Sequence, residues 1–302
     1  MLRLLAAAAL AVLLSGCSAA EETGSTGAPT PPTPPAYDAY VALGDSYTAA
    51  PLVPPTDTST FCLRSEVNYP ALVAEAMPGS TLTDVSCSGA TTADTVARQT
   101  GQGGSVPPQF DALEPGTDLV TVGLGGNDER LFAGILGSCI QLAPNDPTGS
   151  PCADAAADGP DLDTTLARIR ANLVDVVAGV RHRSPQARVV LVGYPQLVPE
   201  SGSCEDLPLA TGDYPFARTV NEGLADAVRE AAAEADAGFV DLWEPSTGHD
   251  ICADEPWING RVTSAETALA YHPLAVEQEA VAELVLDAIS GARRGPVRRP
   301  RP

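Results

Sequence analysis

The segment Tyr37-Asp-Ala-Tyr-Val-Ala-Leu-Gly-Asp-Ser46-Tyr-Thr48 decides the fold class of this sequence. Its apolar run, residues 40–43, stops at Gly44, which is typical of a buried parallel strand that delivers Ser46 to its carboxyl end. In open α/β sheets, ligands and catalytic groups gather at that end of the strands. Gly, Asp and Ser are also ordinary turn residues, so the tripeptide taken alone favours a strand followed by a plain turn.

Other stretches of the chain predict the remaining elements. We expect further strands at residues 81–86, 118–124, 188–193 and 238–242. Helices are expected at about residues 69–77, from 162 to shortly before Pro185, at about 214–235, and after Pro273. The segment that holds Cys139 and Cys152 is expected to be a loop. Strands that alternate with helices predict an α/β fold, a three-layer αβα sandwich with a central parallel sheet of about five strands.

The composition excludes several classes of function. Of 302 residues, 17 are basic and 39 acidic, so the formal net charge is −22. A protein that neutralises phosphates needs clustered basic side chains, so this balance argues against a nucleic-acid partner. All basic residues are arginine, and the lack of lysine excludes Schiff-base and phosphate-loop chemistry, which need its amine. We expect one domain, residues 37–291, that is a monomer without a metal or organic cofactor.

The first residues are typical of an exported protein. Arg3 precedes an apolar run, residues 4–14, which has the length of a signal-peptide core and is short for a membrane span. The run leads into Leu-Ser-Gly-Cys17, which resembles the bacterial lipoprotein signal. We therefore expect residues 1–17 to be a signal peptide that ends at a lipidated Cys17, anchored to the outer face of the cytoplasmic membrane. The alternative is cleavage after the small residues 18–20 and secretion.

Two further segments show no periodic pattern of apolar residues. Residues 18–36 are rich in Pro and Thr, which is typical of an extended linker between a membrane anchor and a folded domain. Residues 292–302 are rich in Arg and Pro, and we expect them to be a disordered tail.

Six cysteines remain when Cys17 is set aside, an even number that is typical of disulfides in an exported chain. Six cysteines allow fifteen pairings. We expect sequential pairing, because each bridge then closes one loop region: Cys62–Cys87, Cys139–Cys152 and Cys204–Cys252. A zinc site is the competing interpretation, but no close Cys-x-x-Cys or Cys/His spacing supports it.

Three of the predicted strands are followed by residues with catalytic potential. Ser46 follows the first strand, Gly89 the second and Asn127 the third, and the carboxyl ends of parallel strands meet at one sheet edge. Acyl transfer needs a nucleophile, a base, and N–H donors aimed at the developing oxyanion. The backbone N–H groups of Ser46 and Gly89 and the side-chain amide of Asn127 are the candidate donors. Because Gly89 has no side chain, a substrate can approach its backbone closely.

The candidate base is one of three histidines. His182 lies at the end of a predicted helix, where a surface cation is expected. His249 lies in the segment between Cys204 and Cys252. His272 precedes the last predicted helix, from where it can reach the serine after the first strand. We expect His272 to be the base, with His249 as the alternative.

Together these residues resemble the SGNH (GDSL) hydrolase superfamily. Its blocks stand in the family's order as Gly44-Asp45-Ser46, Gly89, Gly125-Gly126-Asn127-Asp128 and His272. The six cysteines and Pro256-Trp257-Ile-Asn-Gly260 resemble the secreted actinobacterial esterase and lipase branch, which carries three sequential disulfides. The resemblance implies a flavodoxin-like SGNH hydrolase fold and a serine esterase or lipase activity.

The chain departs from the family at the catalytic Asp. The family usually places a carboxylate two or three residues before the histidine, where it fixes the imidazole tautomer, and here Ala270 and Leu269 stand at those positions. In the branch resembled, a backbone carbonyl takes this role, so the resemblance implies a Ser–His dyad in which the Leu269 carbonyl orients His272. Glu266 or Asp254 is the alternative orienting group.

The predicted activity is hydrolysis of carboxylic esters, small-molecule or lipid, through an acyl-enzyme on Ser46. Alternatives on the same site are a carbohydrate or wall-polymer acetylesterase and a phospholipase, and a catalytically silent binding lipoprotein is the alternative from another class. The motif residues Asp45 and Asp128 are expected to hold loops by hydrogen bonds. The acidic residues 250–255 are a candidate for Ca²⁺, but a solvated loop is favoured.

Overall fold

The structure is a computed structural model that describes residues 37–291. The predicted signal peptide with Cys17, the linker of residues 18–36 and the tail of residues 292–302 lie outside the described residues. Within residues 37–291, no helix has the length and apolar character needed to span a membrane.

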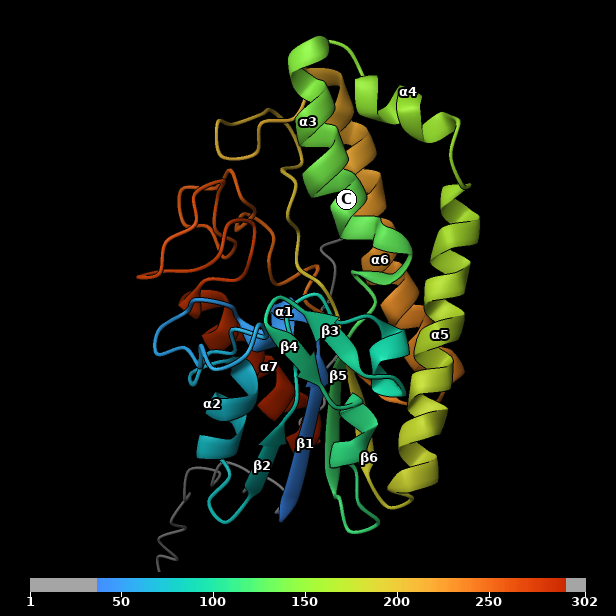
Figure 1. The fold of residues 1–302 in the computed structure, drawn as a ribbon, viewed down its shortest axis with the longest axis vertical. Coiled ribbons are helices and arrows are strands. Elements are labelled where there is room, and N and C mark those ends of the chain that lie inside the picture. Colours follow the sequence, from blue (N-terminus) through green and yellow to red (C-terminus); the bar gives the residue numbers. More distant parts are fainter. Residues whose placement is uncertain (1–36, 292–302) are drawn as a thin grey trace, which may run out of the picture. The chain divides into compact units, whose positions relative to one another are not determined.

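A parallel sheet of five strands runs through the described part of the chain (Figure 1). Its members are the five predicted strands, which are confirmed: β1 (Ala39–Gly44), β2 (Thr81–Asp84), β5 (Leu119–Gly123), β6 (Arg188–Val192) and β7 (Gly238–Val240). All neighbouring pairs are parallel, in the order β2-β1-β5-β6-β7. The order reverses between β1 and β5, and at such a switch point the carboxyl ends of two strands frame a crevice for ligands.

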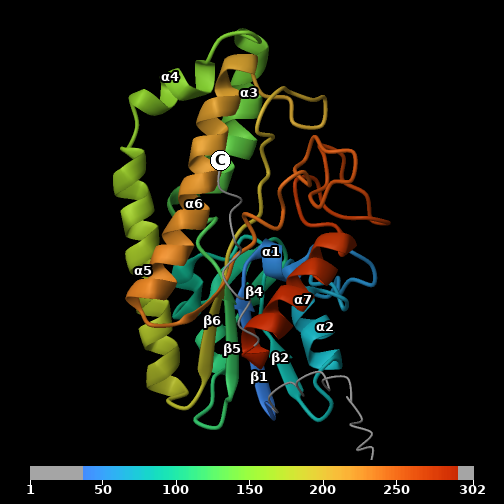
Figure 2. The ribbon, with the colours of Figure 1, turned by 180° about the vertical axis from the view of Figure 1, so that it is seen from behind.

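Helices cover both faces of this sheet, which confirms the predicted αβα sandwich (Figures 1 and 2). Side chains alternate between the faces, because successive residues of a strand point to opposite sides. In β1, Tyr40 and Ala42 face one core, while Val41 and Leu43 face the other. The helices over the first core are α2 (Tyr69–Glu75) and α7 (Ala275–Ser290), and those over the second are α5 (Leu162–Arg183) and α6 (Tyr214–Glu234).

Local sequence explains where these helices begin. Asn68 caps α2 by accepting the N–H of Ala71, and Asp161 caps α5 by accepting that of Thr164. Such caps satisfy N–H groups that have no partner within the helix. The helix α7 begins two residues after Pro273, so this proline precedes the helix and does not lie in its first turn.

The segment that holds Cys139 and Cys152 is helical, whereas the sequence predicts a loop. Its elements are η3 (Asp128–Arg130), the π-helix η4 (Ala133–Cys139), α3 (Ile140–Leu142), η5 (Ala143–Asn145) and α4 (Pro151–Ala157). Proline is compatible with the first position of a helix, and alanine is the best helix former, so α4 suits its sequence. Each piece is too short to display a helical period, which is why the pattern did not reveal it.

Other short elements lie around the sheet. The antiparallel hairpin of β3 (Gln99–Gly101) and β4 (Gly104–Val106) was not predicted, because three-residue strands carry no visible alternation. Single helical turns complete the description: α1 (Ser46–Ala49), η1 (Thr92–Thr95), η2 (Gln109–Ala112) and η6 (Thr211–Asp213).

The three predicted disulfides are confirmed as Cys62–Cys87, Cys139–Cys152 and Cys204–Cys252. The bridged cysteines are separated by 25, 13 and 48 residues, so each bridge closes a local loop. The second bridge joins η4 to α4. Cross-links of this kind restrict the unfolded chain and typically contribute about 2–4 kcal/mol each.

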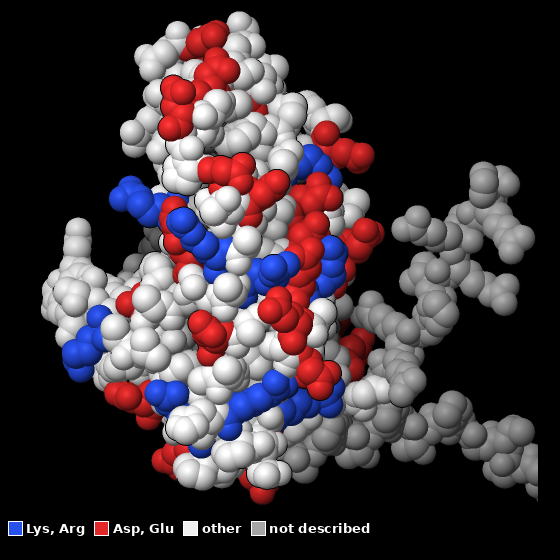
Figure 3. Space-filling view, turned by 90° about the vertical axis from the view of Figure 1, so that its right-hand side faces the viewer, with Lys and Arg blue, Asp and Glu red and all other residues white. Residues whose placement is uncertain are grey.

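Charged side chains of both signs cover the face that carries α4 and α5 (Figure 3). Arg170 of α5 contacts Glu230 and Glu234 of α6 at 3.0 and 3.5 Å, and Arg168 contacts Glu129 at 3.4 Å. Exposed pairs contribute little to stability, about 0–1 kcal/mol each. The negative charge of the chain is therefore partly offset on this face.

Candidate active site

Ser46 is the first residue of α1, the short helix that follows β1. Asp45 caps this helix, because its Oδ1 accepts the N–H of Tyr47 at 2.8 Å. The N–H of Asp45 donates to the Gly123 carbonyl of β5 at 2.9 Å. These bonds fix a sharp strand-to-helix turn and confirm that the motif aspartate holds a loop. Ser46 is 5% exposed, and its Oγ forms no hydrogen bond with a described residue.

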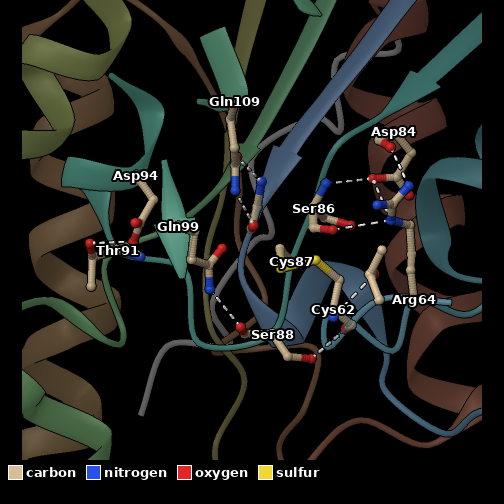
Figure 4. The surroundings of a disulfide bond; sticks show 12 residues. Cys62, Arg64, Asp84, Ser86, Cys87, Ser88, Thr91, Asp94, Gln99 and Gln109 are labelled. Atoms are coloured by element: carbon tan, nitrogen blue, oxygen red, sulfur yellow. Dashed lines mark hydrogen bonds and ion pairs between the residues drawn. A yellow bond between two sulfur atoms is a disulfide. The ribbon is translucent and has the colours of Figure 1, made fainter. Parts of the chain in front are cut away.

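Gly44, just before this turn, is held by the buried amide of Gln109 (Figure 4). Gln109 Oε1 accepts the N–H of Gly44 and Nε2 donates to its carbonyl, both at 2.9 Å. A Cβ on Gly44 would lie 2.2–2.8 Å from three atoms of the Thr48 side chain. Only glycine fits here, which explains the first motif position. No pattern in the sequence singles out Gln109.

Gly89 lies in the segment after β2, two residues after Cys87. Figure 4 shows the Cys62–Cys87 disulfide of this segment and its surroundings. Ser88 Oγ donates to the Cys62 carbonyl at 2.7 Å, and Gln99 Nε2 from the hairpin donates to the Ser88 carbonyl at 2.8 Å. Gly89 is exposed and has a φ of +76°, a conformation that favours glycine. The disulfide and the two side-chain bonds thus fix the backbone on which the predicted oxyanion donor stands.

Asn127 follows β5 and contacts the segment after β2. Its Nδ2 donates to the Ala90 carbonyl at 3.0 Å. The next residue, Asp128, accepts the backbone N–H of Thr92 at 2.8 Å, the Thr92 hydroxyl, and Asn172 Nδ2 at 2.9 Å. The second motif aspartate therefore also holds loops, as predicted, and it joins them to α5.

Hydrogen bonds join the three strand ends into one edge. The Cys87 N–H donates to the Gly44 carbonyl at 3.0 Å, so the segments after β1 and β2 are in contact. Neither the backbone N–H of Ser46 nor that of Gly89 has a hydrogen-bond partner among the described residues. The amide nitrogen of Asn127 carries a second hydrogen besides the one that it gives to its backbone partner. This edge therefore offers three N–H donors.

His272 lies in the loop before α7, with its Nδ1 2.8 Å from the Ala270 carbonyl. This corrects the prediction that the Leu269 carbonyl orients the ring. The Leu269 carbonyl instead accepts the backbone N–H of His272 at 3.2 Å and the side-chain amide of Asn259 at 3.1 Å. Tyr271 has a φ of +62°, and the chain turns back there. Because a carbonyl only accepts, Nδ1 carries the proton and Nε2 is the basic atom.

Tyr47 joins the loop that holds His272 to the turn that holds Ser46. Its ring centroid is 5.9 Å from that of His272, and its hydroxyl donates to the Tyr271 carbonyl at 3.0 Å. The N–H of Leu269 donates to the Pro51 carbonyl just after α1, at 2.9 Å. The loop that carries the predicted base thus packs against the residue that directly follows the serine. The imidazole Nε2 forms no hydrogen bond with a described residue.

Burial shifts the pKa values of two groups at this edge. It lowers the pKa of His272, against the opposing effect of the Ala270 carbonyl, so the ring is neutral near pH 7 and able to accept a proton. Burial raises the pKa of Asp45 to about 7, although hydrogen bonds from the Tyr194 hydroxyl and the Tyr47 N–H favour its charged form. The carboxyl group of the residue that directly precedes Ser46 therefore titrates close to neutrality.

The alternative candidates are not part of this arrangement. His249 stacks on Trp257 with ring centroids 4.9 Å apart, and its Nδ1 is 2.7 Å from the Glu255 carbonyl, within its own loop. Glu266 and Asp254 are exposed, and neither forms a hydrogen bond with the imidazole of the candidate base. The described part of the chain holds no group of three or more His, Cys, Asp or Glu that could bind a metal ion.

Tyr194, a buried residue just after β6, was missing from the predicted site. Its hydroxyl donates to Asp45 Oδ2 at 2.6 Å and accepts the N–H of Gly126 at 2.9 Å. One signal could have found it, because it directly follows a predicted strand at the same sheet edge.

Gln278 connects α7 to the short helix α1 and to α2. Its Nε2 donates to the Tyr47 carbonyl at 3.0 Å, and its Oε1 accepts the N–H of Tyr69 in α2 at 2.7 Å. Its neighbour Glu277 is 1% exposed and accepts a bond from Gln278 Nε2 at 2.6 Å. Burial raises the pKa of Glu277 to about 8. No sequence pattern marks either residue.

A cavity of about 740 Å³ lies between η4, α4, α5 and α6. Its lining is largely apolar and includes Leu131, Ile135, Leu142, Leu162 and Phe216. The lining includes Glu129 but none of the candidate donors or the candidate base.

Comparisons with known proteins identify the arrangement. The GDSL-like Lipase/Acylhydrolase family matches residues 42–276 of the chain. Lipase 2 of Streptomyces coelicolor is 41% identical over 259 residues, which cover 83% of this chain and 85% of that protein. The chain belongs to the GDSL-like lipase/acylhydrolase family. A lipase of Streptomyces rimosus is 34% identical over 242 residues, which cover 78% of this chain and 81% of that protein. The chain is therefore a carboxylic ester hydrolase.

Two crystal structures share the fold of this GDSL-like protein. They are phospholipase A1 from Streptomyces albidoflavus NA297 and the extracellular lipase from Streptomyces rimosus. Each has a TM-score of 0.67 and 28% identity over 83% of this chain, with 98% and 99% of the respective structures covered. The resemblance inferred from the motif blocks is confirmed. The three disulfides are consistent with export of the chain.

Proposed function

We propose that this GDSL-like protein is an exported serine esterase or lipase in which Ser46 attacks the carbonyl carbon of a carboxylic ester. The observation that carries the proposal is the meeting of four segments at one sheet edge. The turn with Ser46, the segments with Gly89 and Asn127, and the loop with His272 are joined there by hydrogen bonds and ring contacts.

His272 acts as the base in this proposal. Its Nδ1 donates to the Ala270 carbonyl, which leaves Nε2 free to take the proton of the serine. A neutral carbonyl fixes the tautomer but stabilises an imidazolium less than a carboxylate does. We therefore propose a Ser–His dyad with a backbone orienting group. Bonds between a catalytic serine and its base are often loose before substrate binds, so the unbonded Oγ of Ser46 is compatible with this role.

The reaction proceeds in two halves. Ser46 Oγ forms a bond to the ester carbonyl carbon while Nε2 of His272 takes the hydroxyl proton. The tetrahedral oxyanion is held by the N–H groups of Ser46 and Gly89 and by Asn127 Nδ2. Its collapse breaks the bond to the alcohol, which leaves with the proton of the imidazolium. Water then attacks the acyl-enzyme with Nε2 again as base, which releases the carboxylic acid and restores the serine.

Hydrolysis of p-nitrophenyl esters, from acetate to palmitate, tests the nucleophile. We expect Ser46→Ala to abolish turnover and Ser59→Ala, at an exposed position in the following loop, to retain it. The preferred chain length distinguishes an acetylesterase from a lipase. Wild-type activity no greater than that of Ser46→Ala would refute the proposal for these substrates.

The oxyanion donors have their own test. Asn127→Ala is expected to lower kcat by roughly 10²–10³, the usual effect of losing one oxyanion donor. Asn145→Ala, at an exposed position in η5, is the matched control and should have wild-type kcat. An Asn127→Ala variant with wild-type kcat would remove this residue from the proposed site.

Phospholipid hydrolysis is a second candidate, because phospholipase A1 from Streptomyces albidoflavus shares the fold over nearly its whole length. Release of fatty acid from phosphatidylcholine vesicles, compared with release from the p-nitrophenyl series, separates the two. Reaction of the oxidised protein with a fluorophosphonate, read as a mass shift that Ser46→Ala lacks, would support Ser46 as the nucleophile. A mass shift that persists in Ser46→Ala would contradict that role.

The proposal includes a lipid anchor at Cys17. The apolar residues 4–14 followed by Leu-Ser-Gly-Cys17 support it. A diacylglyceryl group supplies two acyl chains, enough for stable membrane attachment. Metabolic labelling with a fatty acid should mark the wild-type protein and not Cys17→Ala, and the unlabelled variant should appear in the medium. A wild-type protein that is unlabelled and secreted would contradict the anchor.

A further inference from the structure

The buried hydroxyl of Tyr194 hydrogen-bonds the residue before the proposed nucleophile and the residue before the proposed oxyanion donor. Tyr194 is 1% exposed, and its hydroxyl donates to Asp45 Oδ2 at 2.6 Å and accepts the Gly126 N–H at 2.9 Å. Asp45 directly precedes Ser46, and Gly126 directly precedes Asn127. A single oxygen atom therefore joins the turn after β1 to the segment after β5.

We propose that the Tyr194 hydroxyl is a positioning group, which holds the Gly126–Asn127 backbone at a fixed distance from the nucleophile turn. The inference rests on the proposed function, because it requires the Asn127 amide to stabilise the oxyanion. Glycine backbones have many accessible conformations, so the two glycines before Asn127 need an outside restraint. An oxyanion donor is effective only when it is held in place before the reaction.

The hydrogen-bond partners of the Tyr194 hydroxyl determine which bond it donates and which it accepts. A phenol has one hydrogen to donate, and Asp45 Oδ2 accepts it, so a lone pair of the oxygen is left for the Gly126 N–H. The ring itself packs edge-on against Tyr47 and Phe132, with centroids 5.5 and 5.2 Å away. Tyr194→Phe therefore preserves the ring packing and removes only the oxygen that joins the two segments.

Kinetics of Tyr194→Phe and a double-mutant cycle with Asn127→Ala test the role, using the purified full-length protein and a p-nitrophenyl ester. We expect Tyr194→Phe to lower kcat by roughly 10- to 100-fold, with KM changed less than about twofold, because a small misplacement of a catalytic group has effects of this size. In the Asn127→Ala background, Tyr194→Phe should lower kcat less than about twofold. The effects of two substitutions are not additive when one residue acts through the other.

Tyr40→Phe is the matched control. The Tyr40 hydroxyl is also fully buried and also makes a side-chain bond, to Thr121 Oγ1 at 2.8 Å, but this bond joins β1 to β5 and includes no proposed site residue. Both variants lose a buried hydroxyl and should lose similar thermal stability. Only Tyr194→Phe should lose kcat, which a merely structural role would not produce.

Hydrogen exchange of the Gly126 amide, followed by NMR, gives a readout independent of esterase activity. It should accelerate in Tyr194→Phe and not in Tyr40→Phe. If Tyr194→Phe has the kcat of Tyr40→Phe, or if its loss adds fully to that of Asn127→Ala, the positioning role is overturned while the proposed function stands. If Ser46→Ala is as active as wild type, the proposed function itself fails and the inference fails with it. If Asn127→Ala is unimpaired, this amide leaves the proposed site and the inference alone is overturned.

Discussion

Replacing the buried Glu277 with glutamine is expected to stabilise the protein at alkaline pH and to change little at acid pH. Glu277 is 1% exposed, and its hydrogen-bond partner among the described residues is the neighbouring Gln278 amide. No arginine pairs with it in the described part of the chain. A buried carboxylate without a cation is costly when ionised, whereas glutamine keeps the shape and an oxygen that accepts the same bond.

The pKa of Glu277 determines the size and the sign of this effect. Burial raises that pKa from 4.5 to about 8, so between these values the folded protein holds a proton that the unfolded chain has released. The stability that this proton provides is complete below pH 4.5 and is lost as the pH rises through about 8. At about 1.36 kcal/mol for each pH unit, the interval amounts to ~5 kcal/mol. The position in the first turn of α7 favours a negative charge, so we expect ~2–4 kcal/mol.

Urea unfolding with intact disulfides measures this difference. The free energy of unfolding of Glu277→Gln, relative to wild type, should be larger at about pH 9 than at about pH 5 by ~2–4 kcal/mol. Glu279→Gln, two residues along the same helix and exposed, is the matched control and should differ from wild type by less than ~0.5 kcal/mol at both pH values. An equal difference at the two pH values, or a loss of stability at alkaline pH, would refute the reasoning.

Three further predictions concern the site. Because burial lowers the pKa of His272, the acid limb of the kcat/KM profile on a p-nitrophenyl ester should lie below 6.5, and a limb above that value would contradict the assigned base. Glu266→Gln and Asp254→Asn should each change kcat less than about threefold, whereas a loss on the order of 10⁴ would assign that carboxylate to a triad. Gly89→Ala should cost about 1 kcal/mol of stability, like Gly103→Ala in the hairpin turn, because both glycines have positive φ. Only Gly89→Ala should also lower kcat, because its methyl group would stand where a substrate approaches this backbone. Equal kcat in the two variants would contradict that close approach.

The strands were predictable because buried parallel strands are continuous apolar runs. The ends of the strands were less predictable. Residues 85–86 and 241–242 were predicted as strand, but β2 ends at Asp84 and β7 at Val240. A strand ends where pairing ends, and pairing depends on the partner. The helices η4, α3 and α4 were not predictable, because elements this short are stabilised by the disulfide and by packing against neighbours and not by their own periodicity.

The candidate site was predictable where its residues follow strands. Ser46, Gly89 and Asn127 all stand at the expected sheet edge. The carbonyl that accepts a hydrogen bond from the His272 ring was predicted one residue away, at Leu269 instead of Ala270. Tyr271, between Ala270 and His272, has a left-handed backbone that no residue pattern predicts.

The buried side chains that hydrogen-bond the segments at the carboxyl edge of the sheet could not be predicted from the sequence. Tyr194, Gln109 and Gln278 contact backbone or side chains 149, 65 and 231 positions away. Each bond satisfies a buried polar group, but only the assembled fold determines which distant group needs a partner.

The order of the three disulfides bears on how the protein acquires them. Each of the six cysteines in the described part of the chain is bonded to its nearest neighbour in sequence, with no bridge nested in or crossing another. A polypeptide that emerges amino-terminus first completes each native pair before the next pair appears. Oxidation of neighbouring thiols as they emerge therefore gives the native connectivity directly. We therefore expect a thiol oxidase to suffice for this maturation, without an isomerase to reshuffle wrong pairs.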